Sequence, residues 1–156
     1  MDAKTYISKL ELEPHPEGGF YRESFRSDVG TDQGRACATS ILFLLTSGNP
    51  SNFHRIDAEE VWFYHGGDPL TVHILDKDGS YSSITIGPNL DAGQVLQTVI
   101  PPDVWFGSSC DIDAGFSLVG CVVAPGFTFE GFELAQRSKL LKTYPKYSEI
   151  ILKLTR

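Results

Sequence analysis

The sequence predicts an all-β fold, a sandwich or barrel of short strands with short helices at both ends. Three observations support this. Strand-like segments recur along the chain, glycine- and proline-containing turns separate them, and helical periodicity appears only near the beginning and after Pro125. A chain of 156 residues has the usual length of one domain, so we expect residues 1–156 to fold as a single domain.

The first part of the chain predicts one helix and two strands. Asp2–Leu12 has apolar residues at helical spacing, with Asp2 as N-cap, and the following prolines end the helix. His15–Gly19 has the composition of a turn, and Phe20–Ser27 alternates like a strand. Ala36–Thr46 is almost continuously apolar, which predicts a strand covered on both faces.

Six further strands are predicted before the pattern changes. They are Glu60–His65, Leu70–Leu75, Tyr81–Ile86, Val95–Ile100, Val104–Phe106 and Phe116–Ala124. Asp76–Gly79 is a hairpin turn signal between two of them. Phe132–Leu141 and Pro145–Leu154 show helical periodicity, and we expect two terminal helices there.

Charge and composition exclude several classes of partner. The net charge of -7 argues against binding to nucleic acid or to an anionic membrane, since both require a basic surface. No apolar run approaches the roughly 18 residues of a membrane-spanning helix, and the first residues lack a signal-peptide core. Three scattered cysteines are typical of free thiols in a reducing compartment. We therefore expect a cytoplasmic protein.

The segment Phe53–Gly67 is the predicted centre of the chemistry. Side chains alternate between the two faces of a strand, so Glu60, Trp62 and Tyr64 share one face. A short turn before the strand brings His54 back toward Glu60. The segment thus predicts an imidazole and a carboxylate in one concave surface with aromatic walls.

Each candidate residue also has a purely structural interpretation. His54 can simply hydrogen-bond in a polar corner, and Glu60 can be an exposed residue at the start of a strand. Trp62, Tyr64 and Trp105 are as typical of a core as of a pocket wall.

Two further segments carry candidate polar groups. Arg22, beside Tyr21 on a predicted strand, either forms a surface ion pair or binds an anionic substrate group. His15 precedes a proline in a turn, and we interpret it as a local hydrogen-bonding group.

Two stretches resemble the paired motifs of the cupin superfamily. His54, Glu60 and Gly67 resemble the first motif, and Val99–Phe106 resembles the second. Further stretches are similar to the small single-domain RmlC-like cupins of unknown function, the Cupin_5 type. They are His15–Glu23, Phe53–Arg55, Glu60–Trp62, Val119–Cys121, Ala124–Phe127 and Phe132–Leu134. The resemblance implies a cupin jelly-roll β-barrel, a homodimer and a small-molecule cavity.

The chain departs from the metal-binding cupin pattern at the ligand positions. Asn52 stands where the first histidine is expected and Phe106 where the last is expected, while Asp103 replaces a turn glycine. Only His54 and Glu60 remain of four ligands, and catalytic metal sites usually supply at least three. We therefore expect no metal and no other cofactor.

The resemblance implies three functional hypotheses. The first is a metal-independent enzyme similar to sugar epimerases, with His54 as base, Tyr64 or Tyr21 as acid, and Glu60 orienting the imidazole. The second is a non-enzymatic ligand-binding or sensor barrel, and the third is a metal-dependent oxygenase or isomerase. In each, a small polar metabolite occupies the cavity. The expected ligand-binding residues are Tyr21, Arg22, Trp62, Gln97, Trp105 and Phe106.

Overall fold

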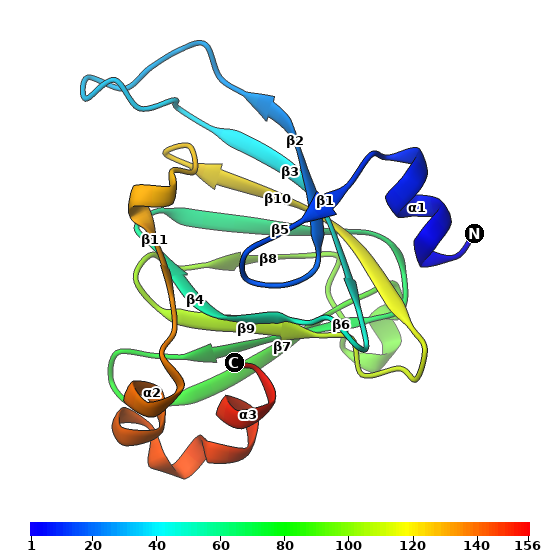
Figure 1. Ribbon diagram of the computed structural model, residues 1–156, viewed down its shortest axis with the longest axis vertical. Coiled ribbons are helices and arrows are strands. Elements are labelled where there is room, and N and C mark those ends of the chain that lie inside the picture. The colour runs from blue at the N-terminus through cyan, green and yellow to red at the C-terminus, as the bar shows by residue number, and fades with distance from the viewer.

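The computed structural model describes all 156 residues as two antiparallel β-sheets with short helices at either end (Figure 1). The larger sheet has the strand order β1-β2-β3-β10-β5-β8, and the smaller has the order β11-β4-β9-β6-β7. The strands are β1 (Glu13–Pro14), β2 (Phe20–Arg26), β3 (Thr39–Thr46), β4 (Ser51–Ile56), β5 (Glu59–Gly67), β6 (Leu70–Leu75), β7 (Tyr81–Ile86), β8 (Gln97–Ile100), β9 (Trp105–Ser109), β10 (Phe116–Ala124) and β11 (Phe132–Leu134). The helices are α1 (Ala3–Lys9), α2 (Arg137–Thr143) and α3 (Ser148–Lys153), with 3-10 turns η1 (Leu90–Ala92), η2 (Phe129–Gly131) and η3 (Pro145–Tyr147).

The all-β prediction and the jelly-roll arrangement are confirmed, but the barrel is not closed. Hydrogen-bonded strand ladders run within each sheet, and a single isolated bridge between Ile86 and Val95 links β7 to the chain entering β8. The molecule is therefore a two-layer sandwich whose sheets separate elsewhere, which leaves room between them.

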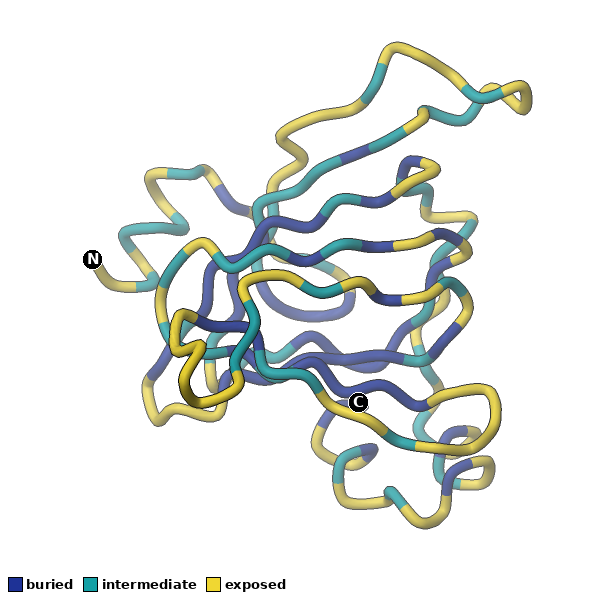
Figure 2. The backbone as a smooth tube through the Cα atoms, turned by 180° about the vertical axis from the view of Figure 1, so that it is seen from behind, coloured by how far each residue is buried: buried dark blue, intermediate teal, exposed yellow.

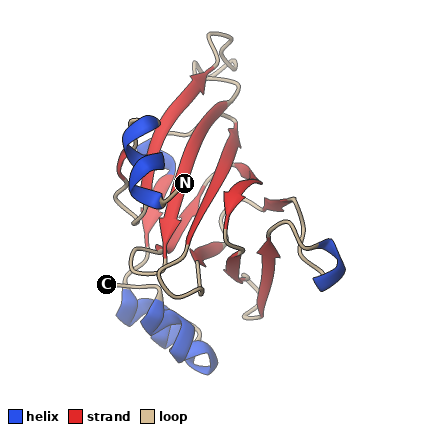
Figure 3. Ribbon diagram, turned by 90° about the vertical axis from the view of Figure 1, so that its right-hand side faces the viewer, coloured by secondary structure: helices blue, strands red, loops and turns tan.

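The larger sheet carries apolar side chains on both faces, so it packs against other elements on both sides. Phe43 and Leu45 of β3 point between the sheets into the main core. Leu44 points to the opposite face, where it packs with Leu12 and Leu118 beneath α1. Helix α1 lies against that outer face, as the side view shows (Figure 3). The strand begins at Thr39. The prediction that it is covered on both faces is confirmed at Phe43–Leu45, whereas Ser40–Leu42 are only half-buried.

The helix predicted for Phe132–Leu141 is wrong in its first part. Phe132–Leu134 forms β11, which pairs with β4 along Ile56, Arg55 and His54 and so covers an edge of the smaller sheet. The helix begins only at Arg137. Helices α2 and α3 then pack with strand residues in a second core, which includes Phe53, Leu75 and Ile151.

The predicted turn between His54 and Glu60 is present, but it does not form a hairpin. Strand β4 pairs with β9 and β11 in the smaller sheet, whereas β5 pairs with β10 and β8 in the larger sheet. The turn after Ile56 therefore crosses between the layers. His54 and Glu60 reach the space between the sheets from opposite sides.

Buried residues lie mainly in the strands near the middle of the molecule, whereas the long connection between β2 and β3 is mostly exposed (Figure 2). The α-helices contain at most seven residues, and none has the length and apolar character required to cross a bilayer.

Candidate functional site

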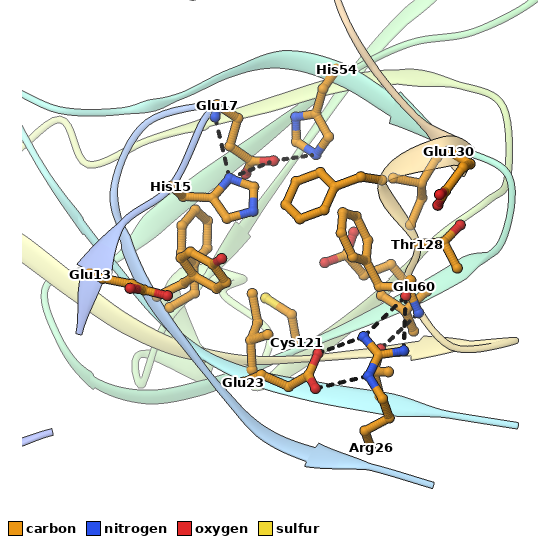
Figure 4. A pocket seen from close by; sticks show the side chains of 18 residues that line it. Glu13, His15, Glu17, Glu23, Arg26, His54, Glu60, Cys121, Thr128 and Glu130 are labelled. Atoms are coloured by element: carbon orange, nitrogen blue, oxygen red, sulfur yellow. Dashed lines mark hydrogen bonds and ion pairs between the residues drawn. The ribbon is translucent and has the colours of Figure 1, made fainter. Parts of the chain in front are cut away.

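A cavity of about 350 Å³ lies between the two sheets, near the turn that precedes β2 (Figure 4). Its inner part is lined by side chains that are almost fully buried. These include Glu17, Phe43, His54, Glu60 and Cys121. Its rim is formed by exposed side chains, which include Glu13, Glu23, Arg26, Phe129 and Glu130. The cavity thus has a buried polar interior that opens to solvent through a charged and aromatic rim.

The turn before β2 places Glu17 inside the cavity. Gly18 has a φ of 116°, and a Cβ atom there would lie 2.0 Å from the carbonyl oxygen of Pro50, so only glycine fits. The backbone N–H of Asn52 donates to the carbonyl of Glu17 at 2.9 Å, which ties the turn to β4. As a result the Glu17 side chain is buried although it belongs to a loop.

Glu17 and His54 form a hydrogen-bonded pair. His54 Nε2 lies 3.1 Å from Glu17 Oε2, and Ser51 Oγ donates to Glu17 Oε1 at 2.6 Å. His54 Nδ1 lies 2.8 Å from the carbonyl oxygen of Asn52. A carbonyl can only accept, so Nδ1 carries a hydrogen and Nε2 of the neutral ring is an acceptor. The neutral pair therefore has its proton on Glu17 Oε2.

Burial favours this neutral form of the pair. It raises the pKa of Glu17 well above 4.5, more than the Ser51 hydrogen bond lowers it, and the charge of Glu60 adds to the rise. Burial also lowers the pKa of His54 to about 3, despite the opposing effect of the Asn52 carbonyl. At neutral pH Glu17 is thus a protonated acid, and its hydrogen is donated to the uncharged imidazole of His54.

His15 completes this end of the cavity. Its Nδ1 accepts the backbone N–H of Glu17 at 3.3 Å, so the predicted local hydrogen bond is present. Its ring also lies 4.5 Å from that of Tyr21, measured between centroids, and both side chains line the cavity. Burial lowers the pKa of His15 to about 4, so this imidazole is also neutral at pH 7.

Glu60 is the second buried carboxyl group of the cavity. It is 7% exposed, and the Trp62 indole and the Cys121 thiol approach its carboxyl group as hydrogen-bonding neighbours. Burial raises its pKa to about 7, while the nearby Trp62 and Cys121 side chains lower it to a smaller extent. Near neutral pH, Glu60 is therefore present in both its acidic and its basic form.

Cys121 faces the same cavity but is not an activated nucleophile. Burial raises the pKa of its thiol well above the usual value, and the neighbouring Glu60 adds to this effect. The thiolate is the nucleophilic form of cysteine, and the raised pKa keeps Cys121 as the protonated thiol. Cys121 therefore lines the cavity without acting as a nucleophile.

Arg26, the cavity's one cationic side chain, is engaged at the rim. Its guanidinium donates to both carboxylate oxygens of Glu23, at 2.9 and 2.7 Å, and to the carbonyl of Phe127 at 3.3 Å. Figure 4 shows this pair on the side of the pocket away from His54 and Glu17.

Three of the predicted site residues line the cavity together, namely His54, Glu60 and Tyr21. The partner predicted for His54 was wrong, since the contacting carboxyl group is Glu17 and not Glu60. The tight turn brings Glu17 onto the imidazole, whereas Glu60 approaches from the other sheet.

The remaining predicted residues lie outside the cavity lining. Tyr64 donates its hydroxyl hydrogen to the carbonyl of Gly67 at 2.6 Å, and Arg22 pairs with Glu11 at 2.9 Å on the surface. Gln97 is exposed on β8 at the edge of the larger sheet.

The predicted aromatic walls belong to the packing of the protein. Trp62 and Phe106 are fully buried in the main core, with the Phe106 ring centroid 4.1 Å from that of His54. Trp105 lies beneath the Arg55 guanidinium at 4.6 Å and packs against the second core.

The sequence interpretation missed Glu17 and assigned His15 only a local role. The available signal was an acidic residue and a histidine flanking Pro16, directly before Gly18 and Gly19. Two consecutive glycines with positive φ allow a turn to fold tightly against a neighbouring strand. The turn composition alone did not reveal that its side chains point inward.

The residues at the four cupin ligand positions do not fit a metal ion. The Asn52 amide donates to the carbonyl of Glu17, and Phe106 has no donor atom. No group of three or more His, Cys, Asp and Glu side chains is arranged to hold a metal. Asp103 has a φ of 62°, so it adopts the conformation of the glycine that it replaces.

Known proteins are similar to this chain in sequence and in fold. The family model Cupin_5, described as "Cupin superfamily (DUF985)", matches residues 4–135. The uncharacterized protein YML079W of Saccharomyces cerevisiae is 31% identical over 143 residues, which cover 80% of this chain and 70% of the yeast protein.

Solved structures agree with this match. Protein SO0799 of Shewanella oneidensis is 44% identical with a TM-score of 0.96, covering 100% of this chain and 98% of that one. A hypothetical protein from Leishmania major is 37% identical with a TM-score of 0.90, covering 99% of both chains. Oxalate decarboxylase of Bacillus subtilis is 15% identical with a TM-score of 0.58, covering 90% of this chain and 36% of that one, which shows a shared fold only.

Proposed function

This chain belongs to the Cupin_5 (DUF985) family of the cupin superfamily, and from that premise we propose that its cavity binds a small polar metabolite and catalyses a metal-independent proton transfer of the epimerase or isomerase kind. One observation carries the proposal. Glu60 is a buried carboxyl group with a pKa of about 7, and it lines a cavity whose rim is exposed to solvent. A general acid or base works best when its pKa lies near the operating pH.

Glu60 is the proposed base. Its carboxylate form removes a proton from a substrate carbon next to a carbonyl group. His54 is a weak base on its own, because burial lowers its pKa to about 3. The role that the sequence suggested for His54 therefore passes to Glu60.

The Glu17–His54 pair is the proposed proton donor. Its one proton lies on Glu17 Oε2, 3.1 Å from His54 Nε2, on the opposite side of the cavity from the sheet that carries Glu60. As the substrate carbon loses its proton to Glu60, the pair donates to the carbonyl oxygen and an enediol forms. Glu60 then delivers its proton to the former carbonyl carbon, while the pair takes a proton from the hydroxyl on the first carbon, which leaves the isomer and restores both groups. Tyr21 lines the same cavity and replaces Tyr64 as the hydroxyl group available for positioning the substrate.

A binding protein without turnover is the second candidate. The observation that favours it is the aromatic cluster at the rim, where the Phe127 and Phe129 ring centroids lie 5.1 Å apart. Such rings supply affinity and shape without any proton transfer.

Solvent deuterium exchange separates the two candidates. A library of small carbonyl-containing metabolites is incubated with the protein in D2O, and mass spectrometry detects gain of deuterium or conversion to an isomer. Glu60→Gln is the test variant, and Glu59→Gln is the control, since Glu59 is the exposed neighbour on the same strand. We expect exchange in the parent and the control, and a loss of roughly 10²- to 10⁴-fold in Glu60→Gln. Equal exchange in all three proteins would rule out Glu60 as the base.

A further inference from the structure

The ionisable side chains around the cavity are mostly acidic. Five of its lining residues carry carboxyl groups, and one carries a permanent positive charge. The acidic residues are Glu13, Glu17, Glu23, Glu60 and Glu130, and the cationic residue is Arg26. A ligand that enters therefore meets mainly acidic side chains.

No free positive charge remains for an anionic ligand. Both carboxylate oxygens of Glu23 and the Phe127 carbonyl already occupy the Arg26 guanidinium. His15 and His54 are buried and uncharged at neutral pH, because desolvation lowers the pKa of each imidazole. Binding a carboxylate or phosphate here would place like charges together in a partly desolvated space.

Several acidic groups are, by contrast, free to receive a cation. Glu13 and Glu130 form no ion pair at the rim, and Glu60 lies more than nine-tenths buried in the same cavity without a cationic partner. A cation at the rim would therefore be attracted by the carboxylates of Glu13 and Glu130, and more weakly by the deeper Glu60.

Aromatic faces lie beside these carboxyl groups. Tyr21 and Phe129 line the cavity near His15, whose ring lies 4.5 Å from that of Tyr21 and 6.5 Å from that of Phe129 between centroids. Aromatic faces attract ammonium groups, and clusters of such rings are used to recognise quaternary amines.

We propose that the cavity selects a small organic cation, a protonated or quaternary amine, over anionic or neutral molecules of the same shape. The ammonium group lies at the rim between Glu13, Glu130 and the aromatic rings, and the rest of the ligand extends toward Glu60. The proposal rests on the proposed function only in using the same cavity, and it adds the charge class of the ligand.

Three probes of nearly the same shape test the charge preference. They are choline, its neutral isostere 3,3-dimethylbutan-1-ol, and the anion 3,3-dimethylbutanoate. Saturation-transfer NMR detects binding to the full-length protein, and titration gives the Kd. We expect choline to bind at least about tenfold more tightly than the alcohol, and the carboxylate to bind most weakly. Absence of choline binding at millimolar concentration, or equal binding of the three probes, would overturn the proposal.

A charge-matched pair of variants locates the site. Glu13→Gln with Glu130→Gln removes two rim charges, while Asp32→Asn with Glu149→Gln removes two charges from exposed positions outside the cavity lining. We expect the first double variant to weaken choline binding roughly three- to tenfold at low salt, with a smaller effect at high salt. The second should bind like the parent, and equal losses in both would place choline elsewhere.

The proposal and the proposed function can fail separately. Choline binding without deuterium exchange in any metabolite would support the charge preference and contradict catalysis. Exchange in a neutral or anionic metabolite, together with no preference for choline, would support catalysis and contradict the charge preference.

Discussion

His54 Nε2 lies 3.1 Å from Glu17 Oε2, so a turn residue and a strand residue share one proton inside the cavity. The other ring nitrogen is held by the Asn52 carbonyl, which fixes the orientation of the imidazole and its tautomer. The two neutral groups thereby hold a proton across the cavity from Glu60, a carboxyl group whose pKa lies near 7. The proposed chemistry depends on this arrangement.

Glu17→Gln should leave the folded protein almost as stable as the parent. A glutamine amide can donate to His54 Nε2 and accept from Ser51, as the protonated carboxyl group does. We expect a change in the free energy of unfolding within about 1 kcal/mol, measured by urea denaturation at pH 7. Glu17→Ala is the comparison, and it should cost roughly 1–3 kcal/mol because it leaves buried polar groups unpaired. A loss of roughly 3–5 kcal/mol in Glu17→Gln would instead indicate an ionised pair.

Glu60→Gln should stabilise the protein at alkaline pH. The pKa of Glu60 is raised from 4.5 to about 7 in the folded state, so its contribution to stability is complete below pH 4.5 and is lost as pH rises through 7. Glutamine resembles the protonated form at every pH. At pH 8 the variant should therefore be more stable than the parent by up to about 3 kcal/mol, and at pH 4 the two should agree. Urea denaturation at both pH values checks this, with Glu59→Gln as the control. No gain at pH 8 would mean that Glu60 ionises without cost.

The purified protein should contain well under one transition-metal ion per chain. Asn52 and Phe106 occupy two of the four cupin ligand positions, and neither is placed to bind a metal. Asn52→His together with Phe106→His should raise the affinity for divalent metals, because residue 106 lies opposite His54 in the strand register. Elemental analysis and metal titration measure both quantities. Stoichiometric metal in the unmodified protein would revive the metal-dependent hypothesis.

We propose that the chain forms a homodimer through the outer face of the larger sheet. Val61 and Val122 lie side by side on β5 and β10, and Val99 on β8 pairs with Val61 and is 54% exposed. Light scattering should give the mass of two chains at micromolar concentration. Val99→Lys should shift the protein toward the monomer, whereas Leu152→Lys, at a 51% exposed position on α3, should not. A monomeric parent would contradict the proposal.

Much of the fold was predictable because strand alternation is a local property of the chain. The bounds of β6, β7 and β10 match the predicted segments, and β2 differs by one residue. The prediction failed at Phe132–Leu134, where pairing with the edge strand β4 prevails over helical periodicity. Such pairing depends on a partner far away in the sequence.

The candidate site was only partly predictable for the same reason. His54 and Glu60 were identified from the strand pattern and the family resemblance, and both line the cavity. Glu17 was missed because its role depends on how the turn folds against β4. Tyr64 has the parity of a pocket residue, but its hydroxyl group donates to the carbonyl of Gly67, the last residue of β5.

The titration of the Glu60 carboxyl carbon by 13C NMR tests the central claim most directly. Comparison with Glu60→Gln assigns the signal, and the exposed Glu59 serves as an internal reference on the same strand. We expect a midpoint near pH 7 for Glu60, because burial disfavours its charged form. A midpoint at or below the ordinary value of 4.5 would show that Glu60 is ionised throughout the neutral range, and would contradict its role as the acid–base group of the cavity.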